Sequence, residues 1–270
     1  MTSVNTNVGA MVALSNLDIT QSSLTTTQNR ISTGLKVTGP QDNASDFSIA
    51  QGIRSDLKAF DAVQQSLSSG TGIIQTAIAG ATSVSNLLAQ IKAKAVEASN
   101  PSNTNNQQSI LSNDFAAMIG QLNTFISNSV YNGRNLLSAN SISVSVTSTI
   151  SGGQLTLSSA STLSGVSATL STGVATTAAA LALLTTIDAQ GLVVGTALGT
   201  LGAAAADLNF LTTFTKSLTD AVTQGLGALV DANLAQESAK LQALQVKQQL
   251  GVQSLSIANQ RPQIILSLFR

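Results

Sequence analysis

Both ends of this 270-residue chain repeat apolar residues at alternating intervals of four and three. Such heptad spacing is typical of helices that pack along a seam. The N-terminal row, two positions of which are polar, is Ala10, Leu14, Leu17, Gln21, Leu24, Gln28, Ile31 and Leu35. The C-terminal row is Val230, Leu234, Glu237, Leu241, Leu244, Gln248, Gly251, Leu255 and Ala258. The simplest arrangement pairs the two terminal helices and places the middle of the chain at their far end.

The C-terminal segment is apolar over more than this one seam. A second row recurs at intervals of seven beside the first, at Leu250, Ile257 and Ile264, and the tip adds Ile265 and Leu268. A single partner helix would not cover both rows, so the pattern favours burial against other molecules. Pro262 interrupts the row and predicts a bend or restart of the last turns.

Helical spacing also fills the first half of the chain between these ends. Gly34 and the Gly39-Pro40 pair predict a loop, after which Asp42 or Asn43 can cap a helix over 43–99. Gly70 and Gly72 predict a break or kink within it. A third helix is expected over about 104–129, because Asn100-Pro101 ends the second and Asn132-Gly133 makes a turn.

The chain changes character after Arg134. From Asn135 to Ala206 the only charged residue is Asp188. Apolar and hydroxyl residues alternate over 141–147, 154–158 and 166–171, which predicts a small β meander over about 140–172. The helical period returns from about 186.

Composition excludes several classes of function. The chain has no Cys, His or Trp, so we expect no thiolate or imidazole catalysis, no common transition-metal site and no cofactor. Charged residues make up 9%, against a typical value of about 25%. The 12 basic and 12 acidic residues cancel, which argues against nucleic-acid binding and favours association. Spaced carboxylates such as Asp42 and Asp46 fit a solvated helix face better than a catalytic pair.

The sequence also predicts neither a leader nor a membrane span. The first basic residue is Arg30, so the N-terminus lacks the basic start of a cleaved secretory signal. The nearest approach to a span is Val174–Ala206, whose Thr and Gly content and Asp188 argue against it. The glycines of 195–202 lack the pattern of a phosphate or dinucleotide loop, and we interpret them as allowing close helix packing.

Several ordered motifs resemble bacterial flagellins, in particular the short alphaproteobacterial type. "NRISTGLKV" (29–37) and "DNASDFSIAQGIRSDL" (42–57) resemble the N-terminal region of the family. "VYNGRNLL" (130–137) is similar to its T-x-FNG-x-x-LL stretch, with Tyr131 where Phe is usual. "DANLAQES" (231–238) and "ANQRPQIILSLFR" (258–270) resemble its D-A-D-x-A-x-E and terminal A-N-Q-x-P-Q-x-x-L-S-L-L-R patterns.

The resemblance implies a mainly α fold of two domains, an inner coiled coil called D0 and a helical bundle called D1, with a small β insertion. It implies a structural subunit with no enzymatic activity, exported unfolded by the flagellar type III system and assembled extracellularly into a filament for motility. Implied partners are further copies of the chain, an export chaperone, a filament cap and hook-junction proteins. The expected segments are 1–37 and 231–270 for D0, 38–139 and 186–230 for D1, and 140–185 for the insertion.

The terminal helices are the expected polymerisation site, and we expect them to be disordered in the monomer and to fold on assembly. The residues assigned to this role are Leu14, Leu17, Leu24, Ile31, Leu241, Leu244, Leu250, Leu255, Ile257, Ile264, Ile265 and Leu268. The alternative interpretation is that these residues form the core of an ordinary intramolecular bundle.

Two further stretches carry expectations. "AQIKAKAV" (89–96) matches the segment that many flagellins present to the innate immune flagellin receptor, where family sequences resemble Q-R-V-R-E-L-A-V. Gln90 replaces an Arg, Ala93 a Glu and Lys94 a Leu, whereas Lys92 keeps a positive charge, which predicts weak recognition. Nineteen of the 37 residues from 141 to 177 are Ser or Thr, either as polar faces of exposed strands or as O-glycosylation sites.

Two other functional classes are weaker readings. A hook–filament junction protein has similar termini, but the "SLFR" ending and "DANLAQES" favour flagellin. A secreted coiled-coil adhesin or translocator should display receptor-binding aromatics or a true membrane span.

Overall fold

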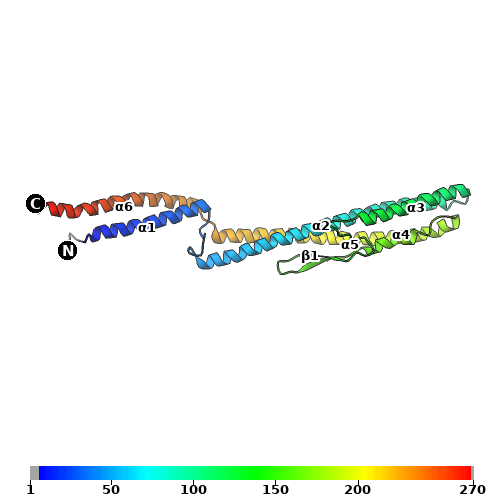
Figure 1. The fold of residues 1–270 in the computed structure, drawn as a ribbon, viewed down its shortest axis with the longest axis horizontal. Helices are drawn as coiled ribbons and strands as arrows, with labels where there is room; N and C mark the ends of the chain where they lie inside the picture. Colours follow the sequence, from blue (N-terminus) through cyan, green and yellow to red (C-terminus); the bar gives the residue numbers. More distant parts are fainter. Residues whose placement is uncertain (1–5, 269–270) are drawn as a thin grey trace. The chain divides into compact units, whose positions relative to one another are not determined.

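The computed structural model describes the backbone of residues 6–268 and the side chains of residues 6–260. The chain forms two compact units, Met1–Ser55 with Ala221–Arg270, and Asp56–Asp220. Helices dominate both (Figure 1). The elements are α1 (Val8–Thr33), α2 (Ala44–Ala98), α3 (Asn105–Asn128), β1 (Val144–Thr147), β2 (Gln154–Leu157), the 3-10 turn η1 (Ser161–Leu163), α4 (Ser164–Leu170), α5 (Thr177–Val230) and α6 (Leu234–Leu268).

Local sequence signals set most helix ends. Gly34 ends α1 in the left-handed conformation, with φ of 72°, which a residue without a β-carbon adopts readily. Of the two candidate caps for α2, Asn43 fills the role, since its side-chain oxygen accepts hydrogen bonds from the amides of Ser45 and Asp46. Thr104 and Gln107 form a reciprocal capping box at the start of α3.

The first unit contains α1 and α6, which run antiparallel and side by side (Figure 1). Its small core is formed by Val37, Ala50 and Val230, where the start of α2 meets the end of α5. The fold class expected from the heptad rows is thus confirmed: long paired terminal helices belong to a mainly helical chain with a small β element.

The second unit has a continuous core built from the remaining parts of α2 and α5 together with α3, α4 and the hairpin. Its largest fully buried side chains include Ile74 and Ile91 of α2, Phe115 and Leu122 of α3 and Ile187 of α5. These positions follow the helical period, so each helix contributes one apolar face.

No break occurs at Gly70 and Gly72, because α2 is continuous from Ala44 to Ala98. The expectation of a break was wrong for a packing reason. A β-carbon on Gly70 would lie 2.8 Å from Val146 Cγ2, and one on Gly72 would lie 2.5 Å from Tyr131 Cζ. The neighbouring side chains occupy the space that these glycines leave, and this packing compensates for their weak helix propensity.

The middle of the chain forms a hairpin and a short helix instead of a three-stranded meander. Strands β1 and β2 pair antiparallel, with Val144 opposite Leu157 and Thr147 opposite Gln154. The expected third strand is α4, in which Val166 and Leu170 are buried four residues apart on one helix face. Helix α5 also begins at Thr177, nine residues before the point where the helical spacing becomes clear.

Two helices, α2 and α5, are long and apolar enough to cross a bilayer by length and composition alone. This is weak support for a membrane span, since core helices of globular proteins meet the same criterion. In the relevant window of α5 only 22% of the residues are buried within the chain, so much of this apolar helix is left uncovered.

Candidate functional site

The heptad row of α6 faces α1. Leu244 is buried, and Leu241 and Leu255 are half-buried beside it. Gly251 lets the two helices approach closely, because a β-carbon there would lie 3.2 Å from Leu17 Cδ1. This row therefore makes the intramolecular contact of α6.

The contact face of α1 agrees with the predicted row at every second position only. Leu17 and Ile31 are half-buried and Leu24 is buried. The positions between them that face α6 are Ala13, Thr20 and Thr27, while the predicted Leu14, Gln21 and Gln28 are exposed. The observed row and the predicted row both contain Leu17, Leu24 and Ile31. The positions that the observed row adds have smaller side chains, which allow α6 to approach α1 more closely. The predicted seam on this side was therefore wrong at Leu14 and Gln28, whereas Gln21, although exposed, contacts α6 through a hydrogen bond from Gln248.

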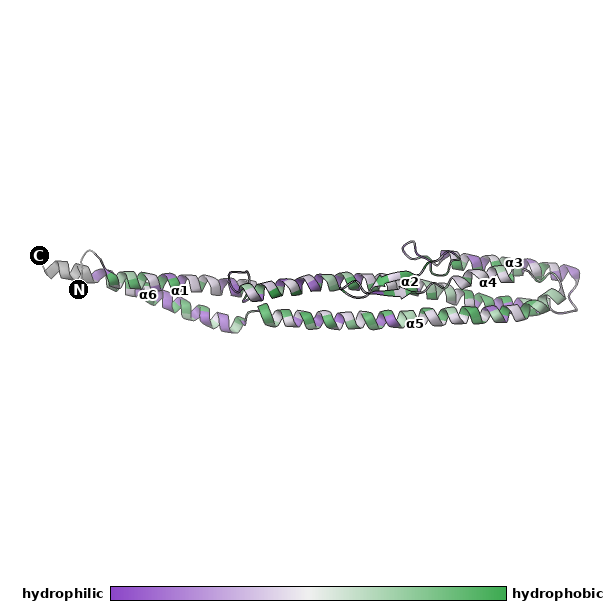
Figure 2. Ribbon diagram, turned by 90° about the horizontal axis from the view of Figure 1, so that it is seen from below, coloured by the Kyte–Doolittle hydropathy of each residue, from purple (hydrophilic) through white to green (hydrophobic). Residues whose placement is uncertain are grey.

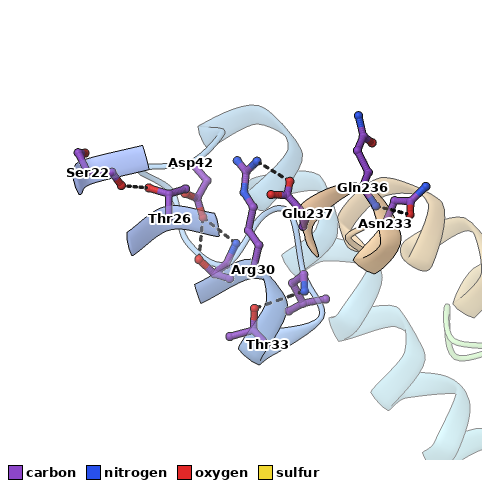
Figure 3. A network of polar contacts seen from close by, with 10 residues as sticks. Ser22, Thr26, Arg30, Thr33, Asp42, Asn233, Gln236 and Glu237 are labelled. Carbon is purple, nitrogen blue, oxygen red and sulfur yellow. Dashed lines mark hydrogen bonds and ion pairs between the residues drawn. The ribbon is translucent and has the colours of Figure 1, made fainter. Parts of the chain in front are cut away.

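A polar cluster lies where α1 ends and α6 begins (Figure 3). Arg30 Nη1 is 3.3 Å from Glu237 Oε1, which forms an ion pair across the two helices. Thr27 Oγ1, Arg30 Nε and Glu237 Oε2 are buried beside this pair without hydrogen-bond partners in the described part of the chain. On the following loop, the hydroxyl and amide of Thr38 donate to the Asp42 carboxylate and hold its pKa below the ordinary value, with a smaller contribution from the positive charge of Arg30.

Backbone hydrogen bonds connect the two chain segments next to this cluster. Leu35 and Asp231 form an antiparallel bridge. The amide of Lys36 donates to the carbonyl of Val230 at 2.7 Å, and the amide of Ala232 donates to the carbonyl of Gly34 at 2.8 Å. The start of α6 is therefore fixed to the end of α1 by main-chain contacts that do not depend on side-chain identity.

The α1–α6 pair leaves a second set of apolar side chains open to solvent. Their exposed fractions range from 49% to 65%. We call them the outer apolar set: Val8, Met11, Val12, Leu14 and Ile19 on α1, and Leu234, Val246, Leu250, Val252 and Ile257 on α6. Most lie off the heptad row, so a count of apolar residues outside the seam would have identified them.

The structure thus divides the residues expected to polymerise into three groups. Leu17, Leu24, Ile31, Leu241, Leu244 and Leu255 face the partner helix in the same chain. Leu14, Leu250 and Ile257 are exposed. Ile264, Ile265 and Leu268 lie outside the residues whose side chains the structure describes, although α6 itself runs to Leu268.

Helix α5 presents another exposed apolar face in the second unit, and hydrophobic residues follow its length (Figure 2). Leu192 and Phe210 are 75% and 74% exposed and lie 18 residues apart, which is five helical turns and hence one face. Phe214 lies one turn further. A β-carbon on Gly195, Gly199 or Gly202 would meet nothing within 4 Å. The expectation that these glycines serve close packing is therefore wrong within the chain.

The stretch expected to be altered for immune recognition lies on α2. Gln90 and Ala93 are exposed. Lys92 forms an ion pair with Asp188 of α5. Lys94 pairs with Glu97 at 2.9 Å and with Asp114 of α3 at 3.7 Å. Both positive charges of this stretch are therefore neutralised by carboxylates of the same chain. The hydrogen bond to Glu97 is also the main cause of a raised Lys94 pKa.

Across the described residues, no group of three or more His, Cys, Asp or Glu side chains is placed to hold a metal ion. The distinctive features of the chain are its paired terminal helices and its uncovered apolar faces.

Comparison with known proteins identifies the family. Residues 4–141 match the bacterial flagellin N-terminal helical region, and residues 184–269 match the bacterial flagellin C-terminal helical region. The chain is 38% identical to flagellin FljK of Caulobacter vibrioides, over 100% of this chain and 99% of that protein. It is 36% identical to a flagellin of Brucella melitensis, over the full length of both. A Bacillus cereus flagellin crystal structure aligns with a TM-score of 0.42 at 19% identity, covering 66% of this chain and 94% of that one. The full-length matches and both family regions agree: the chain belongs to the bacterial flagellin family.

Proposed function

We propose that this flagellin polymerises through the outer apolar set of α1 and α6, and that the resulting filament serves motility. Its family supports a structural subunit of the flagellar filament. The observation that carries the proposed mode of assembly is the outer apolar set itself, ten large side chains of the described residues that remain exposed after α1 and α6 have paired.

The energy of burial is sufficient for such an assembly only if several surfaces act together. Removing the exposed half of each of these side chains from water contributes on the order of 1 kcal/mol. Immobilising a subunit costs about 4 to 15 kcal/mol. Burial of the outer apolar set alone would contribute about as much free energy as immobilising a subunit costs. We therefore infer that the exposed face of α5 adds to the contact. Its phenylalanines Phe210 and Phe214 expose roughly 200 to 330 Å² between them.

In this proposal the inner filament domain contains 1–37 and 231–270, the surrounding domain contains 38–139 and 186–230, and 140–185 faces outward. Ile264, Ile265 and Leu268, predicted from the sequence to polymerise, are included in this proposal. Export proceeds unfolded through the flagellar type III system, which the absence of Cys does not obstruct. A chaperone, a filament cap and hook-junction proteins are the expected partners, in an extracellular and non-catalytic role.

The terminal helices are then expected to order only on assembly, because isolated α1–α6 pairs leave too much apolar surface in water. Amide hydrogen exchange on the monomer tests this, and strong protection over residues 6–35 would contradict it.

Electron microscopy of purified protein after seeded growth tests the main proposal. We expect long filaments from the full chain. A folded chain that stays monomeric under seeding would refute polymerisation.

Recognition by the innate immune flagellin receptor is proposed to be weak. Gln90 and Ala93 lack the charges of the family pattern, and Lys92 and Lys94 are already paired with Asp188, Glu97 and Asp114. An acidic receptor surface would have to displace these partners before it could use either lysine.

Two interpretations apply to the Ser/Thr-rich segment 141–177, an exposed polar strand face and a site of O-glycosylation. Ser145 and Thr156 are exposed and directly opposite each other on the hairpin, so they are suitable either as a polar strand face or as acceptors for O-glycans. Intact mass decides: a value equal to the sequence mass excludes modification, and a larger one should map first to these two residues.

A further inference from the structure

Asn7 joins the first turn of α1 to α6. Its Oδ1 accepts a 3.1 Å hydrogen bond from the amide of Ala10, which caps α1. Its Nδ2 donates a 2.7 Å hydrogen bond to the carbonyl oxygen of Ala258. One side chain therefore both starts the first helix and ties it to the last.

The Ala258 carbonyl lacks its usual hydrogen-bond donor because of the covalent structure of residue 262. In an α-helix this carbonyl would accept from the amide four residues later. Position 262 is a proline, which has no amide hydrogen, and α6 nevertheless continues to Leu268. Pro262 thus leaves the Ala258 carbonyl without its intrahelical donor, and the Asn7 amide supplies one.

The apolar seam does not fix the register of the two helices by itself. Leu17, Leu24 and Ile31 recur every seven residues, so a shift of one heptad exchanges one apolar contact for another. Such a shift would place Asn7 near the Gly251 carbonyl, which the amide of Leu255 already occupies in the helix. The carbonyl freed by Pro262 is a feature that the heptad repeat does not duplicate.

We propose that Asn7 and Pro262 together hold the register at the open end of the terminal helix pair, whose other end is fixed by the main-chain contacts beside Leu35 and Asp231. They act at the end opposite to the Arg30–Glu237 ion pair, and Gln248 Nε2 donates to Gln21 Oε1 between them at 2.7 Å. In this view Pro262 is a positioning residue, because it leaves the Ala258 carbonyl without a donor from its own helix. Asn7 then donates the hydrogen bond to that carbonyl. The inference rests on the proposed polymerisation, because the assembled filament requires one register in every subunit.

The absence of native Cys allows the register to be measured by disulfide cross-linking in the full chain. A β-carbon on Gly251 would lie 3.9 Å from Leu17 Cβ, within the 3.5–4.5 Å range of disulfides. Leu17→Cys with Gly251→Cys therefore reports the observed register. Ala10→Cys with Gly251→Cys reports the shift of one heptad that would bring Asn7 to the Gly251 carbonyl.

Two substitutions separate the donor from the cap. Asn7→Asp keeps an oxygen that caps α1 but removes the donor, and Pro262→Ala restores an amide that takes the Ala258 carbonyl. Asn16→Asp adds the same charge at an exposed position of α1 and serves as the matched control. We expect Asn7→Asp and Pro262→Ala each to lower the ratio of native to shifted cross-link about fivefold. Their combination should lower it no further, because donor and acceptor act as one unit.

The cross-links are measured on filaments where these grow and on the monomer otherwise. A ratio for Asn7→Asp equal to that of Asn16→Asp, effects that multiply in the double variant, or no native cross-link in the parent would each overturn the register lock. Filament growth is scored separately by microscopy. A chain that gives the native cross-link and no filaments refutes polymerisation while leaving the lock in place.

Discussion

Gly80 of α2 packs directly against Ser129, so that a β-carbon on the glycine would lie 2.8 Å from Ser129 Cβ. Ser129 is buried and its hydroxyl donates a 2.6 Å hydrogen bond to the carbonyl of Phe125. Leu137 Cδ1 closes the site at 2.9 Å. This contact holds α2 against the end of α3 and leaves no space for an added methyl group.

Gly80→Ala should therefore destabilise the second unit by about 1 to 3 kcal/mol through overpacking, despite the higher helix propensity of Ala. The matched control is Gly120→Ala in α3, where a β-carbon meets nothing within 4 Å. The free energy of unfolding of this control should increase by about 0.4 to 1 kcal/mol. Thermal unfolding followed by circular dichroism measures both, and equal shifts for the two variants would contradict the packing argument.

Leu250→Ser and Leu244→Ala should separate assembly from folding. Leu250 is 56% exposed, so its loss should slow seeded filament growth and leave monomer unfolding unchanged. Leu244 is 8% exposed against α1, so its truncation should cost about 2 to 5 kcal/mol in stability of the helix pair wherever that pair is formed. Light scattering of growing filaments and their thermal dissociation distinguish the two. Normal growth by Leu250→Ser would exclude the outer apolar set as the contact.

Phe210→Ser addresses the exposed face of α5. The ring makes little contact within the chain at 74% exposure, so the free energy of unfolding of the monomer should stay within about 0.5 kcal/mol of the parent value. Filament growth should require a higher protein concentration, because the ring is proposed to be buried by a neighbouring copy. Phe115→Ser, which removes a fully buried ring, provides the opposite pattern, with loss of folding first.

The loop after α1 should carry a pH dependence through Asp42. Hydrogen bonds from the Thr38 hydroxyl, which make the largest contribution, and from the amides of Thr38 and Gly39 lower its pKa from the ordinary 3.8. A depressed pKa stabilises the folded loop above pH 3.8, and this stabilisation is lost as the pH falls through the lower folded value. Nuclear magnetic resonance titration of the Asp42 carboxyl should give a midpoint that rises toward the ordinary value in Thr38→Val. An unchanged midpoint would remove the hydroxyl as the cause.

Receptor recognition can be tested by restoring the family pattern. The parent chain should activate reporter cells weakly. Gln90→Arg, Ala93→Glu and Lys94→Leu combined should increase activation at least tenfold, because the first two positions are exposed and the third removes an intramolecular pair. Asp188→Asn alone should have a smaller effect by releasing Lys92. Full activation by the parent would refute the proposal.

The sequence by itself determined the helical class, the pairing of the chain ends and the α6 residues that face α1. Those features follow from a period of apolar residues long enough to average over local exceptions, and from caps such as Asn43 and Gly34 that act within one turn. The family motifs supplied the assignment to flagellins.

Tertiary structure decided where several local patterns were equally compatible. Thr27 instead of Gln28 lies against α6, since both belong to a valid heptad row and only the closeness of the partner helix selects between them. Gly70 and Gly72 continue a helix because Val146 and Tyr131 fill the space beside them. Val166 and Leu170 form a helix because a short segment takes the conformation that buries its apolar residues in the available core. The hydrogen bond from Asn7 to Ala258 joins residues 251 positions apart, a separation at which only folding determines which groups meet.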